Sequence, residues 1–199
     1  MILIINVCKE KLHYYEFVKP VEDILKKMKI KSFTRHYKKM FFTRDCKKMK
    51  KSYWGNAKKI IICGTSLKDN EFLKKDIRFW RRNIPILGIC AGMQMIQIAE
   101  ELDRQVRELD IRNNLNHLIK KKTEIGYYHE DFKKKFLSLS GKHEVYHLHN
   151  NYLPLPKDFE QFNSGKIPQA IKHKTKPIYG VLFHPEVRNR KVIEEFLKL

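Results

Sequence analysis

The sequence predicts an α/β protein with a mixed, mainly parallel central sheet and helices on both faces of that sheet. Short apolar runs alternate with segments whose apolar residues recur at helical spacing, as they do in parallel βαβ units. Apolar residues make up 42% of the chain and aromatic residues 12%, which supplies a sizeable core and excludes a disordered protein. Because domains usually hold about 100–200 residues, we expect a single domain over residues 1–199.

The first half of the chain alternates strands with helices. Three apolar runs are typical of strands covered on both faces, and the segments after them carry apolar residues on one helical face. In chain order, the expected elements are a strand at 2–7, a helix at 18–28, a strand at 58–63, a helix at 72–80, a strand at 84–89 and a helix from Cys90 to near Leu102.

The second half is richer in strands joined by short loops. These strands either extend the sheet or form an antiparallel flap. A last helix is expected because the apolar residues near the C-terminus share one helical face. The expected elements are strands at 123–128, 143–149, 169–173 and 178–183 and a helix at 187–199, while the Lys- and Met-rich segment 38–51 has no clear assignment.

A cysteine ends the third expected strand, in Gly88-Ile89-Cys90-Ala91-Gly92. The flanking glycines allow a sharp strand-to-helix turn, the arrangement of a nucleophile elbow. Such a turn holds the sulfur at the carboxyl edge of the sheet and at a helix N-terminus, whose dipole favours the thiolate. The Ala91 N–H would then face the oxyanion that the thiolate creates when it attacks a substrate carbonyl. The alternative interpretation is a buried cysteine before an ordinary helix.

A histidine follows the last expected strand, in Phe183-His184-Pro185-Glu186. A thiolate nucleophile needs an imidazole to move protons, and the imidazole needs a third group that fixes its tautomer. Because Pro185 is rigid, one turn can present both His184 and Glu186. Together with Cys90, these residues predict a catalytic Cys-His-Glu triad.

Four stretches together resemble the class I (triad) glutamine amidotransferase family. Two surround Cys90 and the His184-Pro185-Glu186 segment, and a third is the Glu-x-Gly strand at 123–126. The fourth, 172–181, is similar to the strand pair before the histidine in the glutaminase subunit of archaeal two-subunit GMP synthase. The resemblance covers nearly the whole chain and implies a flavodoxin-like α/β fold.

The resemblance implies hydrolysis of the side-chain amide of glutamine through a glutamyl thioester on Cys90. The ammonia would pass to a separate ATP-dependent synthetase, with GMP synthetase, which converts XMP to GMP, as the favoured partner. This chain would need no cofactor, because ATP and magnesium would bind the synthetase. The residues implied besides the triad are Ala91, Gly64 and Thr65 as backbone oxyanion donors, and Gln94, Leu148, His149 and Asn151 as substrate-binding residues.

Three segments depart from the family pattern. The first strand continues as Asn6-Val7-Cys8-Lys9-Glu10 where the family has a Gly-Gly-Gln segment. Thr65 stands where the family has the second residue of a Gly-Gly pair, and Leu148-His149-Asn150-Asn151 stands where GMP synthases read Ser-His-x-Asp. An amidotransferase for a different ligase, or a γ-glutamyl hydrolase with the same triad, therefore remains an alternative. A catalytically degenerate basic module that binds an acidic protein or RNA is the alternative from another functional class.

The formal net charge is +20, from 42 Lys and Arg against 22 Asp and Glu. Such a charge suits phosphate contacts, yet no nucleic-acid-binding module is recognisable, so we expect a basic surface without a nucleic-acid partner. No apolar run approaches the ~20 residues that span a bilayer, so no membrane partner is expected.

The cysteines and histidines carry two further expectations. Four cysteines without CxxC spacing and the lack of a secretory signal favour a reduced protein in the cytoplasm. His147 and His149 alternate on one strand face, as zinc ligands do, but no carboxylate or cysteine stands at matching spacing nearby. We therefore expect no metal site.

Overall fold

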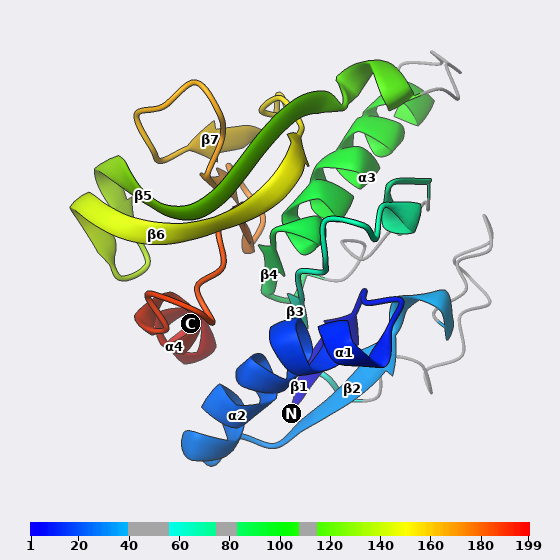
Figure 1. Ribbon diagram of the computed structural model, residues 1–199, viewed down its shortest axis with the longest axis vertical. Helices are drawn as coiled ribbons and strands as arrows, with labels where there is room; N and C mark the ends of the chain where they lie inside the picture. The colour runs from blue at the N-terminus through cyan, green and yellow to red at the C-terminus, as the bar shows by residue number, and fades with distance from the viewer. Residues whose placement is uncertain (40–55, 75–82, 108–114) are drawn as a thin grey trace.

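The computed structural model describes residues 1–39, 56–74, 83–107 and 115–199. A seven-stranded sheet runs through the molecule in the strand order β2-β1-β3-β4-β9-β8-β7 (Figure 1). The first five strands of this order are mutually parallel, whereas β8 is antiparallel to both of its neighbours. The predicted mixed, mainly parallel sheet is confirmed.

The four strands at the centre of the sheet are short and apolar because both faces are covered. Nearly all of their residues are buried, as expected of parallel strands between helical layers. The sheet consists of β1 (Ile2–Asn6), β2 (Ser32–His36), β3 (Lys59–Ile62), β4 (Ile86–Ile89), β7 (Phe159–Gln161), β8 (Ala170–His173) and β9 (Ile178–Val181).

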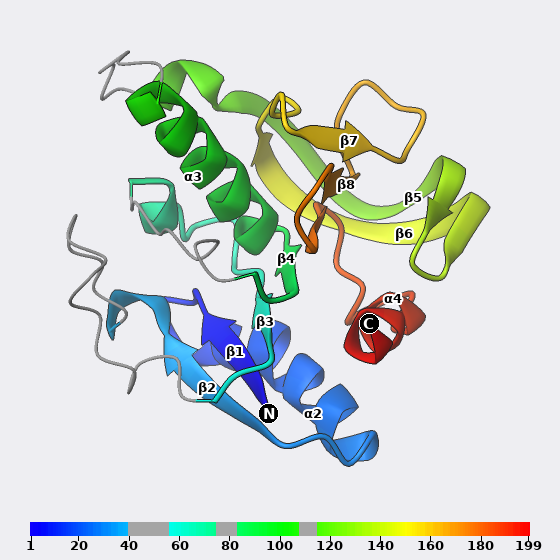
Figure 2. The same cartoon turned by 180° about the vertical axis from the view of Figure 1, so that it is seen from behind.

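Helices cover both faces of the sheet (Figures 1 and 2). One face packs against α1 (Lys11–His13), the π-helical turn η1 (Tyr14–Val18), α2 (Lys19–Lys27) and α4 (Lys191–Lys198). The other face packs against α3 (Ala91–Arg107), whose Met93, Ile96 and Ala99 join the second core cluster. Short 3-10 turns lie at η2 (Tyr37–Lys39), η5 (Glu71–Lys74) and η6 (Leu115–Leu118). No helix among the described residues is long and apolar enough to cross a membrane.

A long hairpin stands apart from the main sheet. Its strands, β5 (Lys120–Phe136) and β6 (Leu139–Tyr152), form a separate two-stranded antiparallel sheet whose register sets Glu124 opposite His149, and an isolated bridge joins Phe132 of β5 to Asn163. The hairpin curves past the end of α3 that follows β4 (Figure 1). The strands of the second half were expected either to extend the sheet or to form an antiparallel flap. They do both: β8 and β9 extend the main sheet, and β5 and β6 form the flap.

The observed elements differ from the predicted ones in several places. The hairpin strands β5 and β6 extend well beyond the strands expected at 123–128 and 143–149, and α1 and η1 were not predicted. Strands β2 and β7 were not predicted, and the terminal helix begins at Lys191 rather than at 187. The helix expected at 72–80 is a 3-10 turn at Glu71–Lys74, and residues 75–82 lie outside the described part. Residues 40–51 of the unassigned basic segment also lie outside it.

Candidate active site

Cys90 occupies the sharp turn between β4 and α3. Its backbone φ is +48°, in the left-handed region that residues other than glycine rarely adopt. The Cys90 N–H donates to the Val181 carbonyl of β9 at 2.7 Å, and the Cys90 carbonyl accepts from the Gln94 N–H at 3.0 Å. These two bonds fix the residue to the sheet and to the first turn of α3. The backbone thus holds Cys90 in a strained conformation of the kind that concentrates at functional sites.

Gly88 and Gly92 permit this turn by their size. A Cβ on Gly88 would lie 2.6 Å from backbone atoms of Gly92 and Met93, and a Cβ on Gly92 would lie 2.2 Å from the Ile62 carbonyl oxygen. Neither glycine has a positive φ. The glycines thus allow the sharp turn, as expected, by letting α3 approach β3 and β4 closely, while Cys90 itself takes the left-handed conformation.

His184 and Glu186 form a buried pair just after β9. The His184 Nδ1 lies 2.7 Å from the Glu186 Oε1, and both side chains are 0% exposed. The His184 N–H donates to the Tyr146 carbonyl of β6 at 2.8 Å, and the ring of Phe17 packs with its centroid 5.3 Å from that of the imidazole. Contacts from η1 and from the hairpin therefore fix the orientation of the imidazole.

The surroundings of His184 favour its protonated form. Burial by itself lowers the pKa of His184, but the charges of Glu186 and Cys90 outweigh it and hold the pKa well above its ordinary value. The His184 Nε2 is buried and makes no hydrogen bond to the described residues. A Cβ on Gly64 would lie 2.6 Å from the His184 Cε1 and 3.4 Å from the Cys90 Cβ, so the imidazole and Cys90 both border Gly64. This arrangement suits proton exchange between sulfur, imidazole and a bound substrate.

The Gly64–Thr65 turn, predicted to supply an oxyanion donor, follows β3 beside Cys90. Thr65 has no positive φ, so its replacement of a glycine introduces no backbone strain of that kind. Its hydroxyl donates to the Asp69 Oδ2 at 2.8 Å. The same oxygen accepts the Lys9 N–H at 3.0 Å and lies 2.9 Å from the His13 Nδ1. Asp69 thus fastens the turn to the segment that enters α1, a network that the sequence did not reveal.

Asp69→Ala is expected to lower the free energy of unfolding by about 3 kcal/mol, because Thr65, His13 and the Lys9 N–H would lose a charged acceptor, and the first two of these contacts are buried. Urea unfolding monitored by circular dichroism would measure the loss. Asp23→Ala is the matched comparison, because Asp23 is 55% exposed and pairs only with Lys19 among the described residues, so its removal should cost less than about 1 kcal/mol. Equal losses in the two variants would contradict the structural role of Asp69.

A narrow pocket opens beside the Cys90 sulfur. The Cys90 Sγ lies 3.5 Å from the Leu148 carbonyl oxygen of β6, to which the thiol donates. The Gln94 side chain of α3 donates to the Asn151 carbonyl at 2.7 Å, and the Asn150 side chain donates to the Leu67 carbonyl at 3.1 Å. The lining consists of Thr65, Ser66, Leu67, Asn70, Phe72, Cys90, Ala91, Gln94, Leu148, His149 and Asn150.

Most of the predicted site residues gather around this pocket. Thr65, Cys90, Ala91, Gln94, Leu148 and His149 line it directly. His184, Gly64 and Glu186 stand behind Cys90, and Asn151 contributes through the carbonyl that holds Gln94. Sequence reasoning missed the wall formed by Ser66, Leu67, Asn70 and Phe72, although these residues directly follow the Gly64–Thr65 turn at the carboxyl end of β3.

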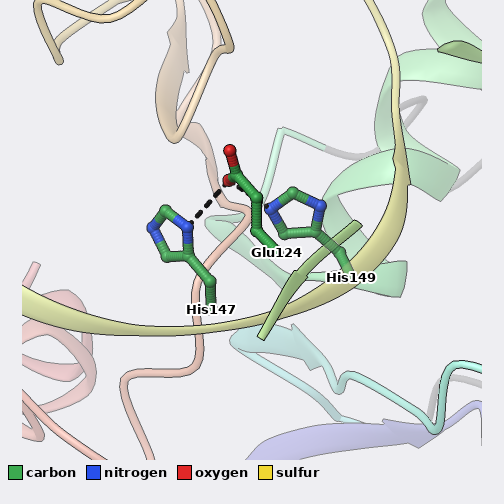
Figure 3. Close-up of side chains that lie close together, drawn as sticks. All are labelled: Glu124, His147 and His149. Atoms are coloured by element: carbon green, nitrogen blue, oxygen red, sulfur yellow. Dashed lines mark hydrogen bonds and ion pairs between the residues drawn. The ribbon is translucent and has the colours of Figure 1, made fainter. Parts of the chain in front are cut away.

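Figure 3 shows a second cluster of titratable side chains, one of which, His149, also lines the pocket. Glu124 of β5 points between His147 and His149 of β6, and one potential ligand atom from each residue lies within 4.8 Å of the others. The expectation that no carboxylate accompanies these histidines is wrong, because antiparallel pairing across the hairpin brings Glu124 to them from more than twenty positions away.

Solved structures share this fold. A protein of Thermoplasma acidophilum assigned as a GMP synthase subunit matches with a TM-score of 0.69 at 20% identity, over 99% of this chain and 92% of that one. A glutamine amidotransferase of Thermotoga maritima matches with a TM-score of 0.59 at 19% identity, over 99% and 80%. At these identities the likeness concerns the fold.

Sequence relatives are subunits or domains of GMP synthases. A subunit of the glutamine-hydrolysing GMP synthase of Methanocaldococcus jannaschii is 35% identical over 127 residues, which is 58% of this chain and 57% of that protein. The glutamine-hydrolysing GMP synthase of Emericella nidulans is 33% identical over 126 residues, 62% of this chain but 23% of that protein.

The family model for class I glutamine amidotransferases matches residues 14–198. This match covers both the elbow at Cys90 and the turn that carries His184 and Glu186. It confirms the resemblance inferred from the sequence motifs. The chain belongs to the class I glutamine amidotransferase family of enzymes.

Proposed function

We propose that this chain hydrolyses the side-chain amide of glutamine with Cys90 as nucleophile and His184 and Glu186 as its partners. One observation carries the proposal: Cys90 has a left-handed backbone conformation at the strand-to-helix turn and lies next to the buried His184–Glu186 pair. A sulfur held at a strand-to-helix turn, with an oriented imidazole beside it, is the arrangement that nucleophilic acyl transfer requires.

In the first half of the reaction, the Cys90 thiolate attacks the amide carbon of glutamine. Negative charge then develops on the amide oxygen, where the Ala91 N–H is available because the first N–H groups of a helix lack intrahelical partners. The backbone of the Gly64–Thr65 turn supplies the second donor. The His184 imidazolium gives its proton to the amide nitrogen, the C–N bond breaks, and ammonia leaves a glutamyl thioester on the sulfur.

In the second half, water attacks the thioester. The now neutral His184 takes a proton from that water, with Glu186 stabilising the imidazolium that forms. The C–S bond breaks, glutamate leaves, and the thiolate–imidazolium pair is restored. In this scheme Gln94 holds the pocket wall through the Asn151 carbonyl, and the backbone at Leu148 and His149 contacts the amino acid portion of glutamine.

We further propose that a separate ATP-dependent synthetase consumes the ammonia. The support is that the M. jannaschii relative is named as one subunit of a glutamine-hydrolysing GMP synthase. A GMP synthetase that aminates XMP is therefore the favoured partner, with ATP and magnesium bound on that partner. The +20 charge would steer association with an acidic synthetase surface. Free thiols at Cys8, Cys63 and Cys90 suit a reducing compartment such as the cytoplasm.

A chloroketone analogue of glutamine tests the reaction. It is expected to alkylate Cys90 and none of the other cysteines, and excess glutamine should protect Cys90; mass spectrometry of peptides would identify the site. Release of glutamate from glutamine should accompany the labelling and should increase when the GMP synthetase of the same organism is added. Unlabelled Cys90 and no glutamate with the synthetase present would contradict the proposal and favour the basic binding module.

Other outcomes of this assay separate the related alternatives. Faster cleavage of γ-glutamyl peptides than of glutamine would assign the triad to a γ-glutamyl hydrolase. Glutamate release that a different ligase stimulates would keep the mechanism and replace GMP synthetase as the partner. Co-purification of RNA with a chain that does not hydrolyse glutamine would favour the interpretation that this protein binds nucleic acid.

A further inference from the structure

We propose that Glu124, His147 and His149 bind one divalent transition metal ion of the zinc class, in a site separate from the catalytic triad. Two imidazoles and one carboxylate are a ligand set that zinc uses, with a fourth position left for water. The inference rests on the geometry of the hairpin and is independent of the proposed reaction.

The three side chains converge on one point (Figure 3). The Glu124 Oε2 lies 2.9 Å from the His147 Nδ1 and 3.1 Å from the His149 Nε2. Ligand atoms about 2.05 Å from a tetrahedral zinc ion stand about 3.3 Å apart. The two distances to the carboxylate oxygen therefore need to lengthen by only a few tenths of an ångström, and all three ligand atoms lie within 4.8 Å of one another.

The two histidines are buried, and their ring nitrogens do not all make hydrogen bonds. Each imidazole is 1% exposed, the His147 Nε2 lacks a hydrogen bond among the described residues, and the His149 Nε2 faces the Glu124 carboxylate at 3.1 Å without hydrogen-bond geometry. A buried, uncharged imidazole is the form that coordinates a metal.

Residues around the cluster orient its members. The Glu130 Oε1 faces the His147 Nε2 at 3.8 Å, on the side of the ring away from Glu124. The Asn163 side chain donates to Glu130 at 3.0 Å, and the Gln169 side chain donates to the Glu124 Oε2 at 3.3 Å. Carboxylates that face the outer nitrogen of a ligating histidine are characteristic of metal sites.

A bound ion would link β5 to β6 on both sides of Leu148. His147 and His149 flank this residue, and its carbonyl accepts the hydrogen bond from the Cys90 thiol. The metal would therefore fix the pocket wall against which the nucleophile rests, while the open coordination position remains for water. Its effect on glutamine hydrolysis would be exerted through this wall.

The test uses the full chain carrying Cys90→Ser and no affinity tag, because a thiolate beside His184 is itself a metal ligand. Cobalt(II) added to the chelator-treated protein is expected to bind once per chain with the visible absorption of a tetrahedral site, and zinc should displace it. Glu124→Gln and His149→Gln, which preserve side-chain size, should each weaken binding at least 10-fold. His129→Ala, which removes an exposed histidine from the same hairpin, should leave the affinity unchanged.

X-ray absorption of the zinc-loaded Cys90→Ser chain gives a reading that does not depend on how the variants fold. Scattering from two imidazoles with oxygen neighbours is expected. No cobalt binding, unchanged affinity in both ligand variants, or sulfur in the first coordination shell would overturn the site. Because this chain cannot turn over glutamine through Cys90, these outcomes are independent of the proposed reaction.

Discussion

Cys90→Ala should reduce glutamine hydrolysis by a factor on the order of 10⁵, because no other group can form the glutamyl thioester. The elbow presents Cys90 alone to the pocket, and the other described thiols are held away from it. Glutamate release, measured with the synthetase present, gives the rate. Circular dichroism would verify that the variant folds.

Cys8→Ala is the matched comparison for a thiol close to the site. Its Sγ lies 3.6 Å from the Gly64 carbonyl oxygen, and burial raises the pKa of Cys8 to about 12, so this thiol stays protonated. The Cys8→Ala chain should retain turnover within 10-fold and retain chloroketone labelling. Substantial turnover in Cys90→Ala, or its loss in Cys8→Ala alone, would remove Cys90 from the mechanism.

His184→Gln should lower kcat/KM by a factor on the order of 10² to 10⁴, because the proton transfers at sulfur and nitrogen would lose their general acid and base. Glutamine approximates the volume of the imidazole between Phe17 and Gly64. The pH profile of kcat/KM, compared with that of the unaltered chain, would distinguish lost proton transfer from a packing defect. A uniform loss at every pH with the same profile would indicate a packing role only.

Glu186→Gln separates orientation from charge. Glutamine keeps a hydrogen-bonding partner for the His184 Nδ1 but removes the carboxylate that raises the pKa of His184. That pKa should then fall, so the imidazolium is lost at a lower pH. The alkaline limb of kcat/KM is expected to move toward lower pH, and a shift toward higher pH would contradict the assigned electrostatics.

The central sheet was predictable because its signals are local. Strands β1, β3 and β4 are continuous apolar runs, and α3 carries a clear helical period after Cys90. Edge strand β2 was missed because Ser32–His36 is polar and half exposed, and β7 because it has only three residues. The hairpin was underestimated because most of β5 is solvated, so its residues carry little hydrophobic periodicity.

The candidate site likewise contains local features, which the sequence predicts, and long-range contacts, which it does not. Cys90, His184 and Glu186 lie in short motifs whose spacing is visible in the chain, so the sequence located them, although their catalytic roles stay predictions. The Asp69 network and the Glu124 cluster join residues that are distant in sequence. Only strand pairing and loop placement bring such groups together, and no single-sequence pattern records that.

Two selective pressures conflict at Cys90. Backbone strain at the left-handed turn favours glycine, whereas the proposed chemistry requires cysteine. A non-glycine residue in this conformation costs about 1–3 kcal/mol, which the surrounding hydrogen bonds to Val181 and Gln94 must offset. Glycine would relieve that cost and remove the proposed nucleophile. A lineage that abandons the chemistry while keeping the fold would therefore drift toward glycine here, and the residue at this turn would reveal whether a homologue still works as a hydrolase.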